Sequence, residues 1–214
     1  KTKLEKEIEK IKEVLNIASK LKNNVWGFKI NDLLFEPNVI PKLKKFGKVF
    51  ADAKLHDIPS TVAHSVARLE KLGANLITVH ASGGVEMMKA AKKAAHRSKI
   101  VGVTILTSRN TVDKKEFLKL VADIKKAGLD GIVCSAHELK YLRNSKLLKV
   151  IPGIRPKWFI LSLSKAYTEK DDQSRKTTPQ EAIKLGADLL VIGRPIVRSS
   201  DPARTLEKIL SELK

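Results

Sequence analysis

Residues 50–58, with the sequence FADAKLHDI, contain the pattern from which the fold of this chain can be built outward. Residues 50–54 have the composition of a buried strand, yet two of the five are charged. Because residues two apart on a strand share a face, Asp52 and Lys54 are expected to point in the same direction. Charges are seldom buried on a strand without partners, because their desolvation is costly. The run therefore predicts either an internal Asp–Lys ion pair or a functional site, with Asp57 as a third ionisable group just past the strand end.

The rest of the chain alternates apolar runs of strand length with stretches of helical periodicity. Strands are predicted at residues 25–30, 49–54, 76–80, 100–106, 131–134, 148–151 and 189–192. Helices are predicted at residues 4–21, 59–72, 84–96, 114–127, 136–143, 179–185 and 202–213. Glycines stand where three of these helices should end, at Gly73, Gly128 and Gly186. The chain therefore reads as a repeated strand–helix unit.

Strands that are apolar on both faces and alternate with helices indicate a parallel sheet covered by helices. Seven such units in one chain favour a TIM (β/α)8 barrel, predicted as a single domain over residues 1–214, over an open doubly wound sheet. No G-x-G-x-x-G follows the first strand, which also argues against a dinucleotide-binding fold. The chain opens on a helix, however, and the first strand of an eight-stranded barrel is missing. Either a strand precedes Lys1 in the native protein, or the barrel is built differently.

The composition excludes several classes of function. The formal net charge is +19, but only 9 of the 42 basic residues are arginine and only 5% of the chain is aromatic. Scattered lysine indicates solvated helix faces and not a nucleic-acid surface, although a positive field helps to gather a phosphorylated anion. The single cysteine, Cys134, rules out an internal disulfide framework and is typical of a reducing cytoplasm. No run reaches the length of a membrane span, and the N-terminus is a charged amphipathic helix.

Functional side chains of such barrels lie at the carboxyl ends of the strands. Reading only those positions gives a polar and strongly charged set: Lys29, Asp52, Lys54, Asp57, His80, Thr107, Ser108, Pro152, Gly153, Arg155, Gly193 and Arg194. The strands themselves are apolar. The sequence therefore predicts an active site at this rim.

Lys29, in VWGFKIND, could simply extend its ammonium to solvent. Beside Asp52 and Lys54 on the adjacent strand, it would instead complete a Lys–Asp–Lys array, which Asp57 would extend to four alternating charges. Such an array keeps its members ionised and can place a cation where negative charge develops.

A second constellation follows the last strand, in LVIGRPI at residues 190–196. A glycine-turn N–H at Gly193 and the planar guanidinium of Arg194 are suited to holding a phosphate, although Arg194 could instead form a surface ion pair. Residues 157–178 form the longest connection, with Gln173 and Arg175 near its far end, and predict a lid. Ser108 could donate a hydrogen bond to a heterocycle or merely cap a helix.

Four motifs occur together: D-x-K-x-x-D-I-P (52–59), P-G-I-R-P (152–156), D-Q-x-R-x-x-T-P (172–179) and V-I-G-R-P-I (191–196). They resemble the motifs of the orotidine 5′-phosphate decarboxylase family, in family order, over the chain from residue 25 to its end. The first motif alone is shared with sugar-phosphate members of the superfamily, such as 3-keto-gulonate-phosphate decarboxylase and hexulose-phosphate synthase. The later motifs separate them.

The resemblance implies decarboxylation of orotidine 5′-monophosphate to UMP without a cofactor or metal. It makes Lys54 the proton donor to C6 of the pyrimidine, places Asp52 against the departing carboxylate, and has Lys29 hold Asp52 and the ribose. It also implies a homodimer in which Asp57 reaches the site of the other subunit, with Ile58 and Thr61 beside it. The remaining substrate contacts that it implies are Ser108 to the pyrimidine, with Pro152, Gln173, Gly193 and Arg194 around the nucleotide.

Two alternatives stay open at this point. A Mg²⁺-dependent sugar-phosphate enzyme of the same superfamily would share the first motif, and a catalytically impaired nucleotide-binding barrel would share the fold. The second alternative arises because the family's first strand ends in an Asp that contacts the ribose, and this Asp has no counterpart from Lys1 onward.

Overall fold

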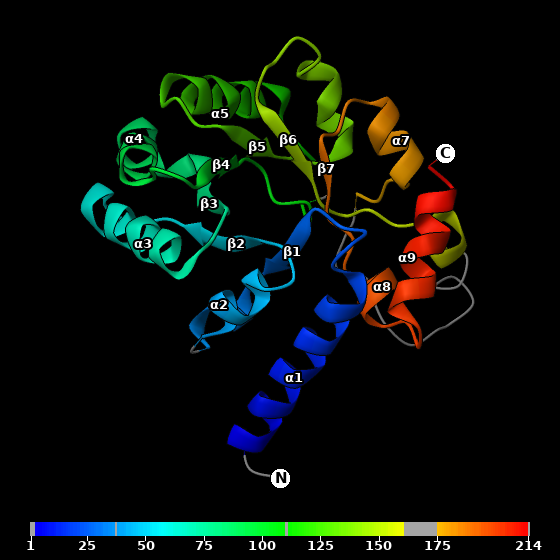
Figure 1. The fold of residues 1–214 in the computed structure, drawn as a ribbon. Helices are drawn as coiled ribbons and strands as arrows, with labels where there is room; N and C mark the ends of the chain where they lie inside the picture. Colours follow the sequence, from blue (N-terminus) through cyan, green and yellow to red (C-terminus); the bar gives the residue numbers. More distant parts are fainter. Residues whose placement is uncertain (1–2, 37, 110, 161–174, 214) are drawn as a thin grey trace.

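A computed structural model describes residues 3–36, 38–109, 111–160 and 175–213. Its seven strands form one sheet in the order in which they occur along the chain, and every neighbouring pair is parallel. The strands are β1 (Gly27–Ile30), β2 (Lys48–Leu55), β3 (Leu76–His80), β4 (Lys99–Val103), β5 (Gly131–Val133), β6 (Leu148–Ile151) and β7 (Leu189–Leu190). Figure 1 shows them curling around a common centre with the helices outside. The predicted barrel class is confirmed, with seven parallel strands forming a partial barrel.

The longer helices lie close to their predicted positions. They are α1 (Lys3–Leu21), α3 (Pro59–Leu72), α4 (Val85–Ala94), α5 (Lys114–Lys126), α7 (Pro179–Lys184) and α9 (Pro202–Ser211). The segment predicted as a helix at residues 136–143 is a 3-10 helix, η3 (Ala136–Tyr141). Four short elements were not predicted: η1 (Asp32–Phe35), α2 (Val39–Lys44), η2 (Ala81–Gly83) and α8 (Arg194–Val197). These four elements have three to six residues each, and their sequences show no clear hydrophobic period.

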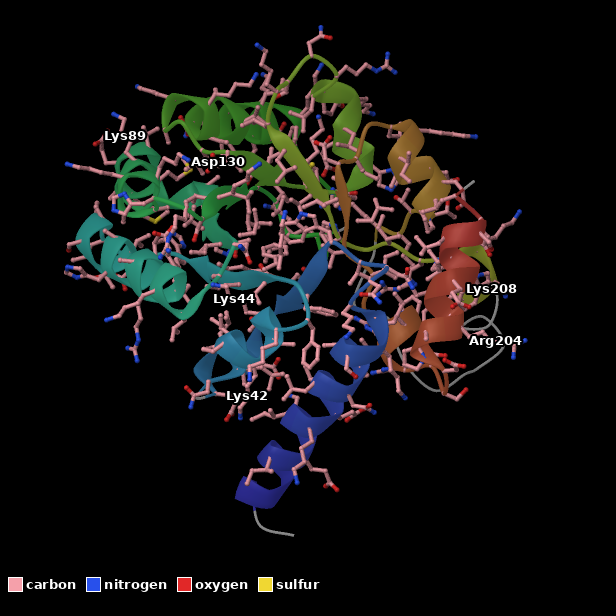
Figure 2. All side chains as sticks on the ribbon, in the orientation of Figure 1. Lys42, Lys44, Lys89, Asp130, Arg204 and Lys208 are labelled. Atoms are coloured by element: carbon pink, nitrogen blue, oxygen red, sulfur yellow. The ribbon has the colours of Figure 1, made fainter. Side chains whose placement is uncertain are left out.

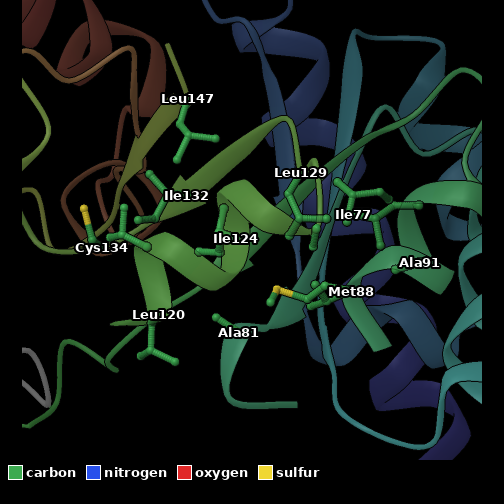
Figure 3. Close-up of a cluster of buried hydrophobic side chains, with 14 of the residues drawn as sticks. Ile77, Ala81, Met88, Ala91, Leu120, Ile124, Leu129, Ile132, Cys134 and Leu147 are labelled. Carbon is green, nitrogen blue, oxygen red and sulfur yellow. The ribbon is translucent and has the colours of Figure 1, made fainter. Parts of the chain in front are cut away.

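Strand alternation divides the apolar side chains into two sets. Ile77 and Ile132 face outward and pack under α4 and α5, where they meet Met88 and Ile124 in the largest core cluster (Figure 3). A smaller cluster faces into the barrel and consists of Phe50, Leu76, Val101 and Val150. Because Phe50 pairs with Leu76 in the ladder, the next inward positions on these strands, two residues on, are Asp52 and Thr78. The inner face therefore changes from apolar to polar toward the carboxyl ends of the strands.

The sheet of the barrel is open between β1 and β7, but the helices outside it close this side. In the described part of the chain, β1 pairs with β2 alone and β7 with β6 alone. Outside this gap α1 packs against α9, and Leu21 joins Leu206 and Ile209 in one buried cluster. An apolar cavity of about 240 Å³ lies at the gap, between residues 24–27 before and in β1 and residues 189–192 in and after β7. The strand that was expected to be missing would therefore lie between β1 and β7.

The excess of basic residues lies on the outer helices. Figure 2 labels Lys42 and Lys44 on α2, Lys89 on α4, and Arg204 and Lys208 on α9, and all five are exposed. This distribution agrees with solvated helix faces. Among the described residues, no helix is long and apolar enough to cross a bilayer.

A buried carboxylate fixes the loop that leads into β4. Glu70, near the end of α3, accepts backbone N–H groups from His96, Arg97 and Ser98, at 2.6 Å for Ser98. Burial would raise the pKa of Glu70, but these N–H donors outweigh it and hold the pKa at about 2, against an ordinary value of 4.5. The charged form therefore stabilises the fold fully above pH 4.5, and this contribution is lost as the pH falls toward 2.

We expect Glu70→Gln to lower the free energy of unfolding at pH 7 by on the order of 2 kcal/mol, because an amide is a weaker acceptor for three N–H donors. Urea unfolding of wild type and variant at several pH values from about 7 down to about 2.5 measures this difference. The difference should shrink below pH 4.5. A difference that stays constant over this range would contradict the assigned pKa.

Candidate active site

The three predicted members of the charge array meet at the carboxyl ends of β1 and β2. The Asp52 Oδ2 atom lies 2.8 Å from Lys29 Nζ and 2.6 Å from Lys54 Nζ. Asp52 is 7% exposed, whereas each lysine keeps about 30% of its side chain exposed. A single buried carboxylate thus orients two ammonium groups toward the mouth of the barrel.

Thr78 on β3 completes the array and was not predicted. Its hydroxyl donates to Asp52 Oδ1 at 3.0 Å and accepts from the Lys54 backbone N–H at 2.7 Å. The strand is irregular here: Lys54 has a φ of 47°, and the β2–β3 register shifts between Ala51 and Leu55. Regular alternation, as expected from the sequence, therefore does not hold at Lys54. The hydroxyl of Thr78 takes the place of the missing ladder contact and fixes a backbone conformation that is unusual for lysine.

The array determines the ionisation of its carboxylate. Burial raises the pKa of Asp52, but the charges and hydrogen bonds of Lys29 and Lys54 outweigh this effect, so the net pKa lies below the ordinary 3.8. Asp52 is therefore an anion throughout the neutral range. Two cations and one anion leave the mouth of the site with a net positive charge, which suits an anionic ligand.

A cavity of about 360 Å³ opens directly over the array. Lys29, Asp52 and Lys54 line one side, and Leu106, Thr107 and Ser108 from the loop after β4 contribute another part of the wall. Val103, Val133, Val150 and Val191 give it an apolar floor. A flat ring could lie on this floor with its polar edge toward Ser108 and a reacting atom toward the ammonium groups.

The predicted substrate-binding residues fall into three groups. Ser108 and Pro152 line the cavity over the array. Gly193 lines a second cavity of about 360 Å³ that also includes Lys29, and Arg194 follows Gly193 as the first residue of α8. Gln173 lies outside the described residues, so the predicted phosphate grip is placed only in part.

Asp57, Ile58 and Thr61 lie apart from the array within one chain. Asp57 is exposed, and its carboxylate accepts the Ile58 backbone N–H at 2.6 Å. Ile58 is 63% exposed, which is high for a large apolar side chain, and Thr61 is exposed in the first turn of α3. The predicted fourth charge therefore does not extend the array inside its own barrel, and its assignment to a second subunit stays a prediction.

We expect Thr78→Val to lower the free energy of unfolding by about 1–3 kcal/mol and activity by roughly tenfold, because the variant keeps the volume but leaves the Lys54 N–H and an Asp52 oxygen without their partner. Thr78→Ser, which keeps the hydroxyl, is the matched control and should retain most activity. Urea unfolding and steady-state kinetics measure the two effects. Equal behaviour of the valine and serine variants would show that the hydroxyl is not needed.

A parallel strand–helix barrel with fixed opposite charges at its carboxyl rim defines a class of enzymes that act on small anionic substrates. The family model "Orotidine 5'-phosphate decarboxylase / HUMPS family" matches residues 7–209. The chain therefore belongs to this family.

The relatives and solved structures that resemble this chain cover almost all of it. The orotidine 5′-phosphate decarboxylase of Saccharophagus degradans is 37% identical over 220 residues, covering 93% of this chain and 89% of that protein. The same enzyme from Geotalea daltonii is 37% identical over 231 residues, covering 97% and 93%. The crystal structure of orotidine 5′-phosphate decarboxylase from Lactobacillus acidophilus superposes with a TM-score of 0.76 at 31% identity, covering 96% and 94%.

Proposed function

We propose that this chain binds orotidine 5′-monophosphate in the cavity over the array, and that Lys54, Asp52 and Lys29 carry out its decarboxylation. Membership of the family, with 37% identity to two curated decarboxylases, assigns to this chain the carboxy-lyase activity that forms UMP in pyrimidine biosynthesis. The observation that supports the division of roles is the pair of ammonium groups held on one Asp52 oxygen beside a cavity with an apolar floor.

Loss of CO2 from C6 of the pyrimidine leaves an electron pair with no adjacent carbonyl to delocalise it. A fixed cation is then the available stabiliser, and Lys54 supplies it and afterwards gives its proton to C6. Asp52, an anion at neutral pH, disfavours the bound substrate carboxylate more than the transition state, from which that charge departs. Lys29 holds Asp52 in place and offers a donor to the ribose.

The phosphate is assigned to Gly193 and Arg194, which follow β7, with Pro152 beside the nucleotide. Gln173, outside the described residues, is the third predicted phosphate ligand. The binding energy of the phosphate is used to position the pyrimidine over the array, remote from the bond that breaks. The positive net charge of the chain favours capture of this dianion.

The reaction is tested by following the absorbance of orotidine 5′-monophosphate on mixing with the purified chain, with EDTA and with added Mg²⁺. We expect the same turnover in both conditions and UMP as the product. Turnover of a keto-sugar phosphate that requires Mg²⁺, with none of orotidine monophosphate, would favour the sugar-phosphate branch instead. Tight UMP binding without turnover would favour an impaired nucleotide-binding barrel.

The exposed face at the start of α3 supports a homodimer. His56, Asp57, Ile58 and Pro59 line an open hollow with residues 83–87 around the start of α4. An isoleucine that is 63% exposed beside the exposed carboxylate of Asp57 fits a self-complementary interface in which Asp57 enters the partner's site. We place the protein, as such a dimer, in the cytoplasm.

A mixed dimer tests the shared site. Lys54→Ala and Asp57→Ala homodimers should each be inactive or strongly impaired, because each of their sites lacks one group. After unfolding and refolding of the two chains together, about half of the molecules are expected to be mixed dimers with one intact site, so roughly a quarter of the wild-type activity should return. Activity of the mixture equal to the mean of the two homodimers would contradict a site shared between subunits.

A further inference from the structure

A buried ion pair lies next to the site but outside the array. Arg175 Nη1 donates to Glu138 Oε1, and the two side chains are 9% and 5% exposed. Glu138 also accepts the Ser135 backbone N–H at 2.8 Å, within the capping box that begins η3. A buried arginine and glutamate are costly to desolvate, so their retention points to a specific role.

The arginine has a second partner on a different segment. Its Nη2 donates to the carbonyl oxygen of Leu106 at 3.2 Å, so one planar guanidinium bridges η3 and the loop after β4. The Leu106 carbonyl also accepts the Arg109 backbone N–H at 3.0 Å, which closes a turn over residues 106–109. Arg175 therefore holds the turn that carries Thr107 and Ser108.

The backbone beside Arg175 is itself anchored. The backbone carbonyl oxygen of Thr177 accepts the Arg155 backbone N–H at 2.9 Å. Thr177 also forms an isolated parallel bridge with Ile154, just after β6. The side chain of Arg175 thus reaches from a segment tied to the end of β6, across the end of β5, to the loop after β4. The backbone beside Arg175 is held in place, and its guanidinium donates in two fixed directions, as a positioning residue requires.

We propose that Arg175 is a positioning residue that holds the Leu106–Ser108 wall of the substrate cavity in place, with Glu138 as its fixed counter-ion. The inference rests on the proposed function, in which Ser108 contacts the pyrimidine. Because the wall contacts the ring and not the departing carboxylate, its displacement weakens binding of substrate and product alike and leaves the chemical step nearly unchanged.

Arg175→Lys separates this role from a purely structural one. A lysine ammonium can still neutralise Glu138, but it lacks the fork needed to reach the Leu106 carbonyl at the same time. We expect the unfolding midpoint to stay close to wild type, KM for orotidine monophosphate and Kd for UMP to rise about tenfold or more, and kcat to stay within about threefold, in line with the loss of one charge-assisted hydrogen bond.

The double variant Arg175→Met with Glu138→Gln removes both charges while keeping an acceptor for Ser135, so that no unpaired charge stays buried. It should show the same rise in KM and Kd. Arg109→Lys is the matched control, because Arg109 lies in the same turn and its side chain forms an exposed pair with Glu116, and it should leave both constants within twofold.

Unchanged KM and Kd in Arg175→Lys, or a parallel fall of kcat and unfolding midpoint with no change in binding, would overturn the proposal. If the wild type showed no turnover, the proposed function would fail separately, and the ratio of UMP dissociation constants between variant and wild type would still decide the role of Arg175.

Discussion

Lys54→Ala is expected to lower kcat for orotidine monophosphate by about 10⁴-fold or more, because the substitution removes both the proton donor and the cation beside the developing carbanion. Asp52 keeps Lys29 as a partner at 2.8 Å, so the fold should survive the change. Stopped-flow or long-time absorbance assays measure kcat, and UMP titration checks that the cavity still binds nucleotide.

The matched control for this variant is Lys93→Ala on α4, an exposed lysine on the outer layer of the barrel. It should leave kcat within about twofold, because exposed charges contribute little. Retention of a tenth or more of the wild-type kcat by Lys54→Ala would rule out the role proposed for Lys54.

Asp52→Asn is expected to reduce kcat by about 10³-fold without raising KM, because it removes a preorganised charge that acts on the departing carboxylate and not on the rest of the nucleotide. The amide also loses the charge that orients Lys29 and Lys54. Steady-state kinetics separate the effect on kcat from the effect on KM. The unfolding midpoint shows whether the variant is still folded.

Asp188→Asn is the control for this second variant. Asp188 also pairs with a lysine at a strand end, Lys149 at 3.2 Å, but at the opposite rim, before β7. Its loss should leave kcat nearly unchanged. If Asp52→Asn instead raised KM tenfold with an unchanged kcat, Asp52 would be a ligand-binding group and not a participant in the chemical step.

The Lys29–Asp52–Lys54 array could be predicted from the sequence because two simple rules apply to it. Parallel strands bring their carboxyl ends to one rim, and Lys29 lies beside Phe50 in the β1–β2 ladder, two residues from Asp52. Charged residues in apolar strands then stand out, and their pairing follows from the cost of burial. The bounds of β3, β6 and α3 were also predicted to the residue. β3 and β6 are short apolar runs, and α3 has an apolar stripe between Pro59 and Gly73.

Other parts of the site could not be predicted, because they depend on contacts between residues that are far apart in the sequence. Thr78 in LITVH looks like any β-branched strand residue, and only the β2–β3 register shows that its hydroxyl reaches Asp52. The positive φ of Lys54 has no sequence signature, since such backbone usually calls for glycine. The partnership of Glu138 and Arg175 joins residues 37 apart, and no pattern in the sequence indicates that the two side chains meet.

The most direct test of the role of Lys54 is the kcat of Lys54→Cys before and after aminoethylation with 2-bromoethylamine, which rebuilds an ammonium of nearly the same length at position 54. Cys134 is 1% exposed, and burial raises the pKa of its thiol, so it should be spared. We predict that the cysteine variant is inactive, and that alkylation restores kcat by at least about 100-fold while treated wild type is unchanged. Full modification at residue 54 with no recovery of turnover would contradict the claim that an ammonium held on Asp52 carries out the reaction.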